Sequence, residues 1–456
     1  MKQIMNGDPH AIAVIGKKKI QGDATYRWSD FVLPLMHRGE PYVFHNLTKR
    51  CYQVSPSLDT ARETVFTSAD ILRDSDLTLL AEDGFLVPAD KDEAAYYEGI
   101  LQVLRMVREK GKKKGYRSFV LLPTTACNAR CVYCFEQGMK YVTMTDEVAE
   151  QTIRFMLDHV CPGEKVTLSW FGGEPLIGEK TIDRITDAMT AAGIDFKSKI
   201  VTNGSLITEA LVEKMKKRWH VYALQITLDG VEEEYNSRKN YVFPYDSAYW
   251  HVLSRIKMIV DSGLYLCIRV NIDEKNIGGV KQMIDDLRPF IKYPENTTID
   301  LVPLFEVQGR ESGIAVWKEL FELMTYIDST EFCTTPHSQL KRVKLRHCMA
   351  ENLTRSIAIA PDGKLYNCEN LDSFESIGTV FDGITRPDLV RAFSTVEKTA
   401  EKCRGCVSLP ECTTFTKCKN PSTHCKFAKR EYLAYDLHRQ LDKKANAASE
   451  EMAADC

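Results

Sequence analysis

Short apolar runs alternate with longer amphipathic stretches through the middle of the chain. The apolar runs are rich in β-branched and aromatic residues and predict strands, which we expect at 118–122, 165–170, 199–202, 223–228, 265–271 and 298–304. The stretches between them repeat apolar residues at helical spacing, and we expect helices at 146–160, 179–192, 208–218, 248–262 and 278–290. This alternation predicts a parallel α/β barrel with its functional site at the C-terminal ends of the strands.

The residues before this region predict a small α+β module. A β-rich segment at 41–54, with a polar turn at 46–49, is typical of a hairpin. Helical periodicity covers 67–81 and 93–109, and a turn and short strand lie between them at 83–88. Hairpin, helix, short strand and helix favour a winged-helix-like module over 1–109. The basic, glycine-punctuated run at 110–116 marks its boundary.

The C-terminal third is organised differently. We expect a hairpin of residues 357–360 and 364–368 around a Pro-Asp-Gly turn, and an amphipathic helix at 430–443. The Ala- and Glu-rich tail at 445–456 is expected to be frayed. The expected domains are the module at 1–109, a barrel at 116–310, a helical bridge at 311–345, a cysteine-rich domain at 346–430, and a helix with a tail at 431–456.

Charge and hydropathy exclude some classes of function. Lys and Arg total 60 and Asp and Glu total 63, which gives a net charge of −3. This balance argues against a nucleic-acid or polyanion binder. No apolar run approaches the ~20 residues of a membrane span, and the N-terminal sequence MKQIMNGDPH has no apolar core of a signal peptide. We therefore expect a cytoplasmic protein without a membrane partner.

Fifteen cysteines are many for such a protein, and clustered cysteines in a reducing compartment more often bind metal than form disulfides. Cys127, Cys131 and Cys134 follow the first expected strand of the barrel at C-x₃-C-x₂-C spacing. Three thiolates on one loop can hold three irons of a [4Fe–4S] cluster and leave the fourth iron open to an external ligand. A zinc loop is the alternative on spacing alone.

The next strand ends carry candidate ligand-binding motifs. Phe171-Gly-Gly-Glu-Pro175 ends the second strand, where Gly172 and Gly173 would let the backbone approach a ligand and Glu174 could accept a hydrogen bond from an ammonium group. Thr202-Asn-Gly204 ends the third strand and Thr227-Leu-Asp-Gly230 ends the fourth.

The fifth strand places Arg269 and Asn271 on one face. An arginine that points into a barrel needs an anionic partner, because burying it unpaired is costly. That partner is either the carboxylate of a ligand or a barrel glutamate.

Together, the cysteine loop, Tyr133 before its last cysteine, and the GGEP, TNG and LDG strand ends resemble the radical S-adenosylmethionine (SAM) superfamily. The resemblance implies a partial (β/α)₆ barrel and SAM bound to the open iron. It also implies reductive cleavage of SAM to a 5′-deoxyadenosyl radical that takes a hydrogen atom from the substrate. The SAM-binding residues that it implies are Tyr133, Gly172, Gly173, Glu174, Asn203, Thr227, Arg238, Lys239 and Arg269.

Two of these positions depart from the family pattern. Thr227 stands where a serine usually contacts the SAM ribose, and its hydroxyl could do the same. The family commonly has His-Asp after this motif and then an arginine that pairs with the SAM carboxylate. This chain has Tyr235-Asn-Ser-Arg-Lys239, so either Arg238 or Lys239 could supply the cation.

The later cysteines resemble the SPASM domain, which carries two auxiliary [4Fe–4S] clusters, although on spacing alone they would favour a zinc ribbon. The resemblance assigns Cys348, Cys368 and Cys418 to one cluster and Cys403, Cys406, Cys412 and Cys425 to the other, which makes three clusters in all. The gap between Cys412 and Cys418 is longer than in the family pattern, and Thr354 occupies a position where some members have a cysteine. The first auxiliary cluster would then lack a fourth protein ligand unless Cys333 supplies it.

The implied function is that of a peptide maturase which forms thioether crosslinks from cysteine sulfur to carbon in a ribosomally made precursor peptide. An external donor such as flavodoxin or ferredoxin would supply the electron. The N-terminal module would bind the leader of the peptide, or would cap the barrel. The alternatives are a sulfatase-maturing, formylglycine-generating enzyme, a peptide epimerase or carbon–carbon crosslinker, and a zinc-binding adaptor without enzymatic activity. Glu369, directly after the second SPASM cysteine where sulfatase-maturing enzymes have an aspartate, is the candidate catalytic residue.

Overall fold

The computed structural model describes residues 1–110, 113–243, 245–304, 313–336, 338, 340–345, 349–352, 355–371, 374–394, 398–411 and 425–454. The chain forms two compact units. The central unit is Lys113–Thr335 with Cys348–Thr395, and the terminal unit is Met1–Lys112 with Pro336–His347 and Val396–Cys456. These units follow the contacts within the chain, and the five domain ranges expected from the sequence stay predictions.

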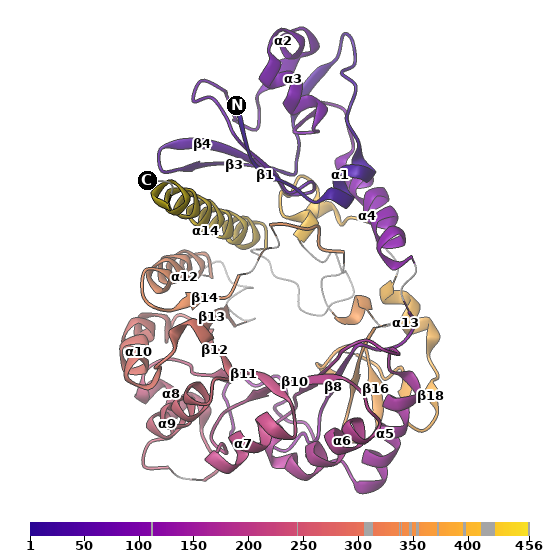
Figure 1. Cartoon of the computed structure of the whole chain (residues 1–456), viewed down its shortest axis with the longest axis vertical. Helices are drawn as coiled ribbons and strands as arrows, with labels where there is room; N and C mark the ends of the chain where they lie inside the picture. The colour runs from indigo at the N-terminus through magenta and orange to yellow at the C-terminus, as the bar shows by residue number, and fades with distance from the viewer. Residues whose placement is uncertain are drawn as a thin grey trace. The chain divides into compact units, whose positions relative to one another are not determined.

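The central unit is built on a mostly parallel sheet (Figure 1). Its six successive parallel strands are β8 (Ser118–Leu121), β9 (Val166–Trp170), β10 (Phe196–Thr202), β11 (Val221–Thr227), β12 (Tyr265–Ile272) and β13 (Thr297–Pro303). Each lies beside its neighbour in the sequence. All six expected strands are confirmed, and so is their parallel order.

Further strands extend both edges of this sheet. The short strand β14 (Cys333–Thr334) pairs in parallel with β13. On the other side β15 (Ser356–Ile359) pairs in parallel with β8, and β16 (Lys364–Tyr366) returns antiparallel to it. β15 and β16 are the expected C-terminal hairpin. β17 (Gly378–Thr379) and β18 (Gly383–Ile384) complete the antiparallel edge.

Helices cover one face of the parallel strands. The expected helices are confirmed as α5 (Asp146–His159), α6 (Glu179–Ala191), α7 (Glu209–Lys217), α9 (Ala248–Asp261) and α10 (Val280–Leu287), which lie along one side of the sheet in Figure 1. Strand β12 shows the result, because Leu266, Ile268 and Val270 are fully buried whereas Cys267 and Arg269 are half-buried. The opposite face is therefore the accessible one, and it carries the polar side chains.

Three further described helices belong to this unit, one of them α13 (Pro387–Ser394). α12 (Gly313–Asp328) lies inside the expected helical bridge. α8 (Glu232–Lys239) was not among the expected helices. Three glutamates in its first turn and Arg238 and Lys239 in its last complement the helix dipole, and Asn240 ends it in the left-handed conformation with φ 44°.

The terminal unit contains two small antiparallel sheets. One has the order β1 (Lys2–Asn6), β5 (Arg50–Gln53), β4 (Glu40–His45), β3 (Val32–His37), and the other has the order β6 (Val65–Thr67), β2 (Thr25–Trp28), β7 (Leu86–Pro88). The expected hairpin at 41–54 is confirmed as β4 and β5, and the short strand at 83–88 as β7. The winged-helix character of this module stays a prediction.

The helices of the N-terminal part of this unit differ from the sequence expectation in two places. Helix α1 (Pro9–Ile15) was not expected, and α4 (Glu93–Glu109) was. The single helix expected at 67–81 is two helices, α2 (Ser68–Arg73) and α3 (Ser75–Glu82). Asp74 separates them because its backbone is extended and its carboxylate caps α3, accepting from the backbone N–H of Asp76 at 2.7 Å and of Leu77 at 3.1 Å.

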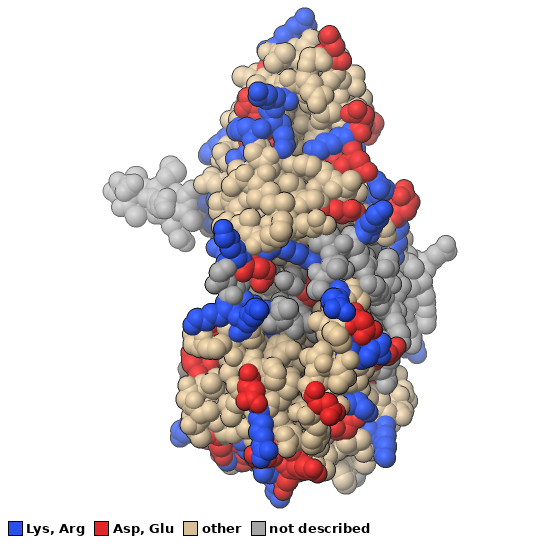
Figure 2. All heavy atoms as spheres, turned by 90° about the vertical axis from the view of Figure 1, so that its right-hand side faces the viewer, with Lys and Arg blue, Asp and Glu red and all other residues tan. Residues whose placement is uncertain are grey.

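The C-terminal helix α14 (Cys425–Ala454) is longer than expected. Its continuation to Ala454 contradicts the prediction of a frayed tail from residue 445, since the Ala- and Glu-rich sequence favours helix. Leu433, Leu437 and Leu441 pack with Leu33 and Phe44 in one apolar cluster. None of the described helices combines the length and the apolarity needed to cross a membrane. Acidic and basic side chains are interspersed over the face that Figure 2 shows.

A buried histidine holds the turn between β4 and β5. His45 Nδ1 accepts hydrogen bonds from the backbone N–H groups of Leu47 and Thr48, both at 3.2 Å, and Nε2 lies 3.1 Å from Gly84 O. An Nδ1 that accepts two hydrogen bonds carries no proton, so Nε2 carries it and donates to Gly84. Burial lowers the pKa of His45 from 6.5 to about 3, and His45 is therefore neutral in the fold.

This histidine predicts a loss of stability in acid. Because the pKa of His45 is lower in the folded state than in the unfolded state, the unfolded chain binds the extra proton between pH 6.5 and about 3. Unfolding free energy should fall in this range by about 1.4 kcal/mol per pH unit. Urea unfolding between pH 5 and 7 should show a shallower pH dependence in His45→Gln than in the parent protein. The exposed His10 provides the control His10→Gln, and equal slopes in all three proteins would contradict the prediction.

Candidate metal centre at the strand ends

The loop after β8 carries three half-buried thiols, those of Cys127, Cys131 and Cys134. The backbone N–H of Cys134 donates to Cys131 O at 3.1 Å, and that of Ala129 donates to Cys127 Sγ at 3.4 Å. Burial raises the pKa of Cys127 to about 11, so a bound cation is needed to stabilise its thiolate. Among the described residues, no group of three or more His, Cys, Asp or Glu is arranged to hold a single metal ion. In an iron–sulfur cluster each thiolate instead binds its own iron.

The glycines after β9 let two loops touch. The backbone N–H of Glu174 donates to Ala126 O at 2.9 Å, and that of Gly173 to Thr124 O at 3.3 Å. A Cβ on Gly172 would lie 2.4 Å from Thr124 O, and one on Gly173 would lie 2.5 Å from Ala126 O. These glycines were expected to let the backbone approach a ligand, but the space beside them is occupied by the backbone next to the cysteine loop. The contribution of these glycines to SAM binding stays a prediction.

Glu174 ties the second and third strand ends together. Its carboxylate is fully buried and accepts from the N–H of Leu176 at 3.0 Å, the hydroxyl of Thr202 at 2.8 Å and the N–H of Asn203 at 2.8 Å. Burial raises the pKa of Glu174, although these three hydrogen bonds work against the shift. Asn203 Nδ2 in turn donates to Asn128 Oδ1 at 2.8 Å, which connects both strand ends to the cysteine loop.

A buried polar triad connects the same loop to the fourth strand end. Tyr133 donates its hydroxyl hydrogen to Asp229, and Lys239 Nζ lies 2.8 Å from the Tyr133 hydroxyl and 3.1 Å from Asp229 Oδ2. The backbone N–H of Asn271 on β12 donates to the other oxygen of Asp229 at 2.9 Å. Burial lowers the pKa of Lys239, but the charge of Asp229 together with the neighbouring tyrosine and cysteine groups outweighs it, and the net shift is upward.

Arg238, next to Lys239 at the end of α8, is also buried, but its hydrogen-bond partners differ from those of Lys239. Its Nη1 lies 2.9 Å from Asp273 Oδ2, and its guanidinium lies over the Tyr133 ring at 5.4 Å from the ring centroid. Its Nε and Nη2 are buried and have no hydrogen-bond partner among the described residues. Buried donors without a partner are costly, so this pair of nitrogen atoms fits an anionic ligand such as a carboxylate.

The accessible face of the sheet carries the last predicted SAM contacts. Thr227 on β11, Arg269 on β12 and Asp300 on β13 are cross-strand neighbours in one row. Arg269 Nε donates to Asn271 Oδ1 at 3.0 Å. Burial raises the pKa of Asp300, and the charge of Arg269 opposes this shift. The carboxylate beside Arg269 in the sheet is thus that of Asp300 and not of a glutamate, and the binding of a ligand by Arg269 stays a prediction.

The second group of cysteines is described only in part. Cys348, Cys412, Cys418 and Thr354 lie outside the described residues, as does the side chain of Cys425. Cys368 follows β16 in the central unit, and its Sγ lies 3.7 Å from Oε2 of Glu369, the candidate catalytic residue. Cys403 and Cys406 lie in the terminal unit, where the N–H of Cys406 donates to Cys403 O at 3.2 Å. Cys333 is exposed on β14.

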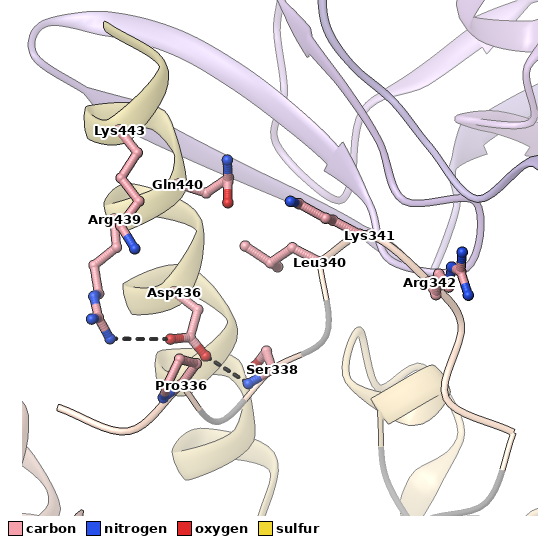
Figure 3. Close-up of a pocket in the computed structure, with 9 residues that line it drawn as sticks. All are labelled: Pro336, Ser338, Leu340, Lys341, Arg342, Asp436, Arg439, Gln440 and Lys443. Atoms are coloured by element: carbon pink, nitrogen blue, oxygen red, sulfur yellow. Dashed lines mark hydrogen bonds and ion pairs between the residues drawn. The ribbon is translucent and has the colours of Figure 1, made fainter. Parts of the chain in front are cut away.

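A pocket of about 410 Å³ lies elsewhere, in the terminal unit (Figure 3). It is lined by Pro336, Ser338, Leu340, Lys341, Arg342, Asp436, Arg439, Gln440 and Lys443. In Figure 3, Asp436 on α14 accepts from the N–H of Ser338, at 2.6 Å. No residue predicted from the sequence lines this pocket.

Comparison with known proteins identifies the central part of the chain. Residues 121–286 match the family model of the Radical SAM superfamily. This segment is a radical SAM domain. The domain implies a [4Fe–4S] cluster and SAM as cofactors, and the chain is a radical SAM enzyme.

The chain is also similar to individual proteins. It is 22% identical over 289 residues to an uncharacterised protein of Methanocaldococcus jannaschii, which covers 59% of this chain and 90% of the relative. It is 27% identical over 154 residues to the radical SAM cyclopropyl synthase TigE of Paramaledivibacter caminithermalis, covering 30% of this chain and 32% of the relative. The chain thus matches about a third of the length of this second relative. The solved structure of native anSMEcpe with bound AdoMet has the same fold, with a TM-score of 0.56, 15% identity, and coverage of 72% of this chain and 99% of that chain.

The close approach of the two loops predicts a sensitive glycine. In Gly173→Ala the new methyl group must push the loop before Cys127 away, which should cost about 1–3 kcal/mol of unfolding free energy and lower the iron content. Thermal unfolding and iron analysis after anaerobic reconstitution would measure both effects. Gly278→Ala is the matched control, because a Cβ there has no atom within 4 Å. Equal iron content in the two variants would contradict this account of the glycine.

Proposed function

We propose that this radical SAM enzyme is a peptide maturase whose Cys127, Cys131 and Cys134 hold the SAM-binding cluster. The observation that carries the SAM site is the buried Arg238, because its two unpartnered nitrogen atoms lie on the helix that contacts the cysteine loop. The backbone N–H of Val132 donates to Arg238 O at 3.1 Å, so the loop and the arginine hold a fixed relation. Arg238 would bind the SAM carboxylate, and Lys239 would hold Tyr133 and Asp229 in place.

When bound, SAM and the reduced cluster supply a radical that abstracts a hydrogen atom from the substrate. The contribution of the chain is to position SAM and the substrate and to exclude water. Glu174 and Asn203 would keep the strand ends fixed around SAM while accepting from or donating to its amino acid group. Gly172, Gly173, Thr227 and Arg269 complete the proposed SAM contacts on the accessible side of the sheet.

The later cysteines would hold two auxiliary clusters. We assign Cys348, Cys368 and Cys418 to one and Cys403, Cys406, Cys412 and Cys425 to the other. The auxiliary clusters would accept the electron that remains after bond formation, and an open iron in the first would bind a substrate thiolate. Glu369, in contact with Cys368, would accept the proton that the substrate thiol releases when it binds.

The proposed substrate is a cysteine-containing precursor peptide. Support comes from the fold likeness to anSMEcpe, which has been solved with bound AdoMet together with the Kp18Cys peptide. The module of some 110 residues before the radical SAM domain suits recognition of a leader. We favour thioether formation, with flavodoxin or ferredoxin as electron donor. The same fold likeness supports formylglycine formation equally well.

Arg238 gives a direct test of the SAM site. Arg238→Lys keeps a cation near Asp273 but loses Nε and Nη2, so SAM affinity should fall about tenfold or more while the iron content is unchanged. Anaerobic equilibrium dialysis with SAM would measure the Kd. Arg184→Lys, on the exposed face of α6, is the control. If Arg238→Lys binds SAM normally and Lys239→Met does not, the carboxylate is bound by Lys239 and this assignment is wrong.

The reaction type can be read from the product. Incubation of the reconstituted enzyme with SAM, a reductant and a cysteine-containing peptide should yield a peptide that has lost two hydrogen atoms and one alkylatable thiol. Formylglycine formation would instead release the cysteine sulfur, and carbon–carbon crosslinking would leave the thiol reactive. The triple variant Cys127→Ala, Cys131→Ala, Cys134→Ala should release no 5′-deoxyadenosine. Persistent release from that variant would refute the proposed cluster.

A further inference from the structure

The segment 398–411, which carries Cys403 and Cys406, is held by side chains of the N-terminal residues within the terminal unit. Its polar contacts follow one another along the segment. Before the cysteines, Thr399 N–H donates to Glu98 at 2.5 Å. Between them, Arg404 pairs with Asp92 at 3.0 Å and Arg62 donates to Gly405 O at 2.6 Å. After them, Asn46 Nδ2 donates to Val407 O at 2.8 Å and Lys49 pairs with Glu411. The N-terminal residues thus contact the segment before, between and after its two cysteines.

Two of these contacts are buried and outweigh the others. Lys49 and Asn46 are 0% exposed and Glu411 is 7% exposed, whereas the side chains of Arg62 and Arg404 are exposed. Exposed ion pairs add little to stability, but a buried cation that loses its carboxylate leaves an uncompensated charge. Asn46 Oδ1 accepts from Lys49 Nζ at 2.6 Å, so the amide joins the ion pair to the backbone at Val407.

Apolar packing follows the same path. Leu47, between Asn46 and Lys49, belongs to one buried cluster with Phe31, Tyr97 and Leu409, and the half-buried Cys403 and Cys406 pack against this cluster. The turn at 45–49 therefore supplies both the apolar and the polar support of the cysteine pair.

The turn itself is fixed before it meets the segment. His45 accepts from two N–H groups of the turn, and the N–H of Lys49 donates back to His45 O at 2.7 Å. Lys49 adopts φ 62°, a left-handed conformation that is unfavourable for a residue with a side chain. Such strain persists where the surrounding contacts impose it. In this backbone conformation the Lys49 side chain reaches Glu411.

We infer that Asn46 and Lys49 are positioning residues for the cluster held by Cys403 and Cys406, so that the N-terminal module is part of the support of this metal site. The inference rests on the proposed auxiliary cluster, whose donor set of thiolates in a C-x₂-C turn suits an iron–sulfur cluster. Residues that support metal ligands from behind fix ligand orientation, and their loss lowers metal content without touching the ligands.

This assignment changes the meaning of a truncation experiment. Deleting residues 1–110 would remove the support of Cys403 and Cys406 together with any leader-binding surface. A loss of peptide modification in that truncation would therefore not show that the module binds the leader. Point variants in the turn at 45–49 separate the two roles, because they leave the exposed surface of the module intact.

The test uses Lys49→Met in the full chain. After anaerobic reconstitution, iron should fall from about twelve to about eight per chain, as one cluster of four irons is lost. SAM cleavage should remain, because the cysteine loop lies in the other unit. In the metal-free protein, Cys403 and Cys406 should react faster with N-ethylmaleimide, as followed by mass spectrometry of peptides. Lys19→Met is the matched control, since Lys19 is an exposed lysine of the same module.

Two further variants make the result decisive. Lys49→Met combined with Glu411→Met removes both charges of the pair and should regain part of the iron that the single variant loses. If Lys49→Met does not fold, Asn46→Ala, which removes the Val407 contact, is judged by the same iron count and thiol reactivity. Full iron and unchanged thiol reactivity in a folded Lys49→Met protein would overturn the inference.

The outcome is also separable from the proposed function. Cys403→Ser by itself should lower the iron content by about four per chain, the content of one cluster. If it does not, the auxiliary cluster is wrong and the positioning inference falls with it. If Cys403→Ser loses the iron and Lys49→Met keeps it, the auxiliary cluster stands and only the positioning inference is wrong.

Discussion

The cysteine loop is held by hydrogen bonds to the ends of neighbouring strands, and the site depends on this constraint. Buried polar groups must be paired, and here the pairing joins segments that are distant in sequence. Glu174 connects two strand ends, Asn203 connects them to Asn128, and Tyr133 and Asp229 connect the loop to a third strand end. Because each partner has a defined direction, the loop has one orientation, and the three thiols have a fixed relation to Arg238.

The sequence predicted the parallel strands of the central unit well, because buried parallel strands are continuous apolar runs that need no partner to be recognised. It did not predict β14, β17 and β18, since strands this short have no pattern of their own and exist only through pairing with neighbouring strands. It missed α8 because that helix is highly charged and lacks an apolar stripe. The break at Asp74 was missed because an aspartate can cap a helix or lie within one, and tertiary packing decides which.

The sequence predicted which residues form the candidate site, but not which residues they contact. Cysteine spacing and strand-end motifs indicated which residues to examine. Their partners were not indicated, because Asp273, which follows β12, and Asp300, within β13, belong to no recognisable motif. Arg238 and Lys239 were indistinguishable in the sequence. In the structure Lys239 contacts the Tyr133–Asp229 pair, whereas two nitrogen atoms of Arg238 have no partner among the described residues. The glycines after β9 were singled out correctly as sites of close approach, but the neighbour is backbone.

The position of β15 has a consequence for the biogenesis of the metal centre. Strand β8, which leads into the cysteine loop, lies between β9 and β15, and β15 is formed by residues 356–359. During synthesis the ribosome releases the three cysteines long before it releases the strand that completes their parent sheet. Such pairing between distant segments forms slowly, because the chain between them must first be ordered. The nascent cysteine loop therefore emerges before its final framework can form, since β8 gains its second parallel neighbour only once residues 356–359 have been synthesised.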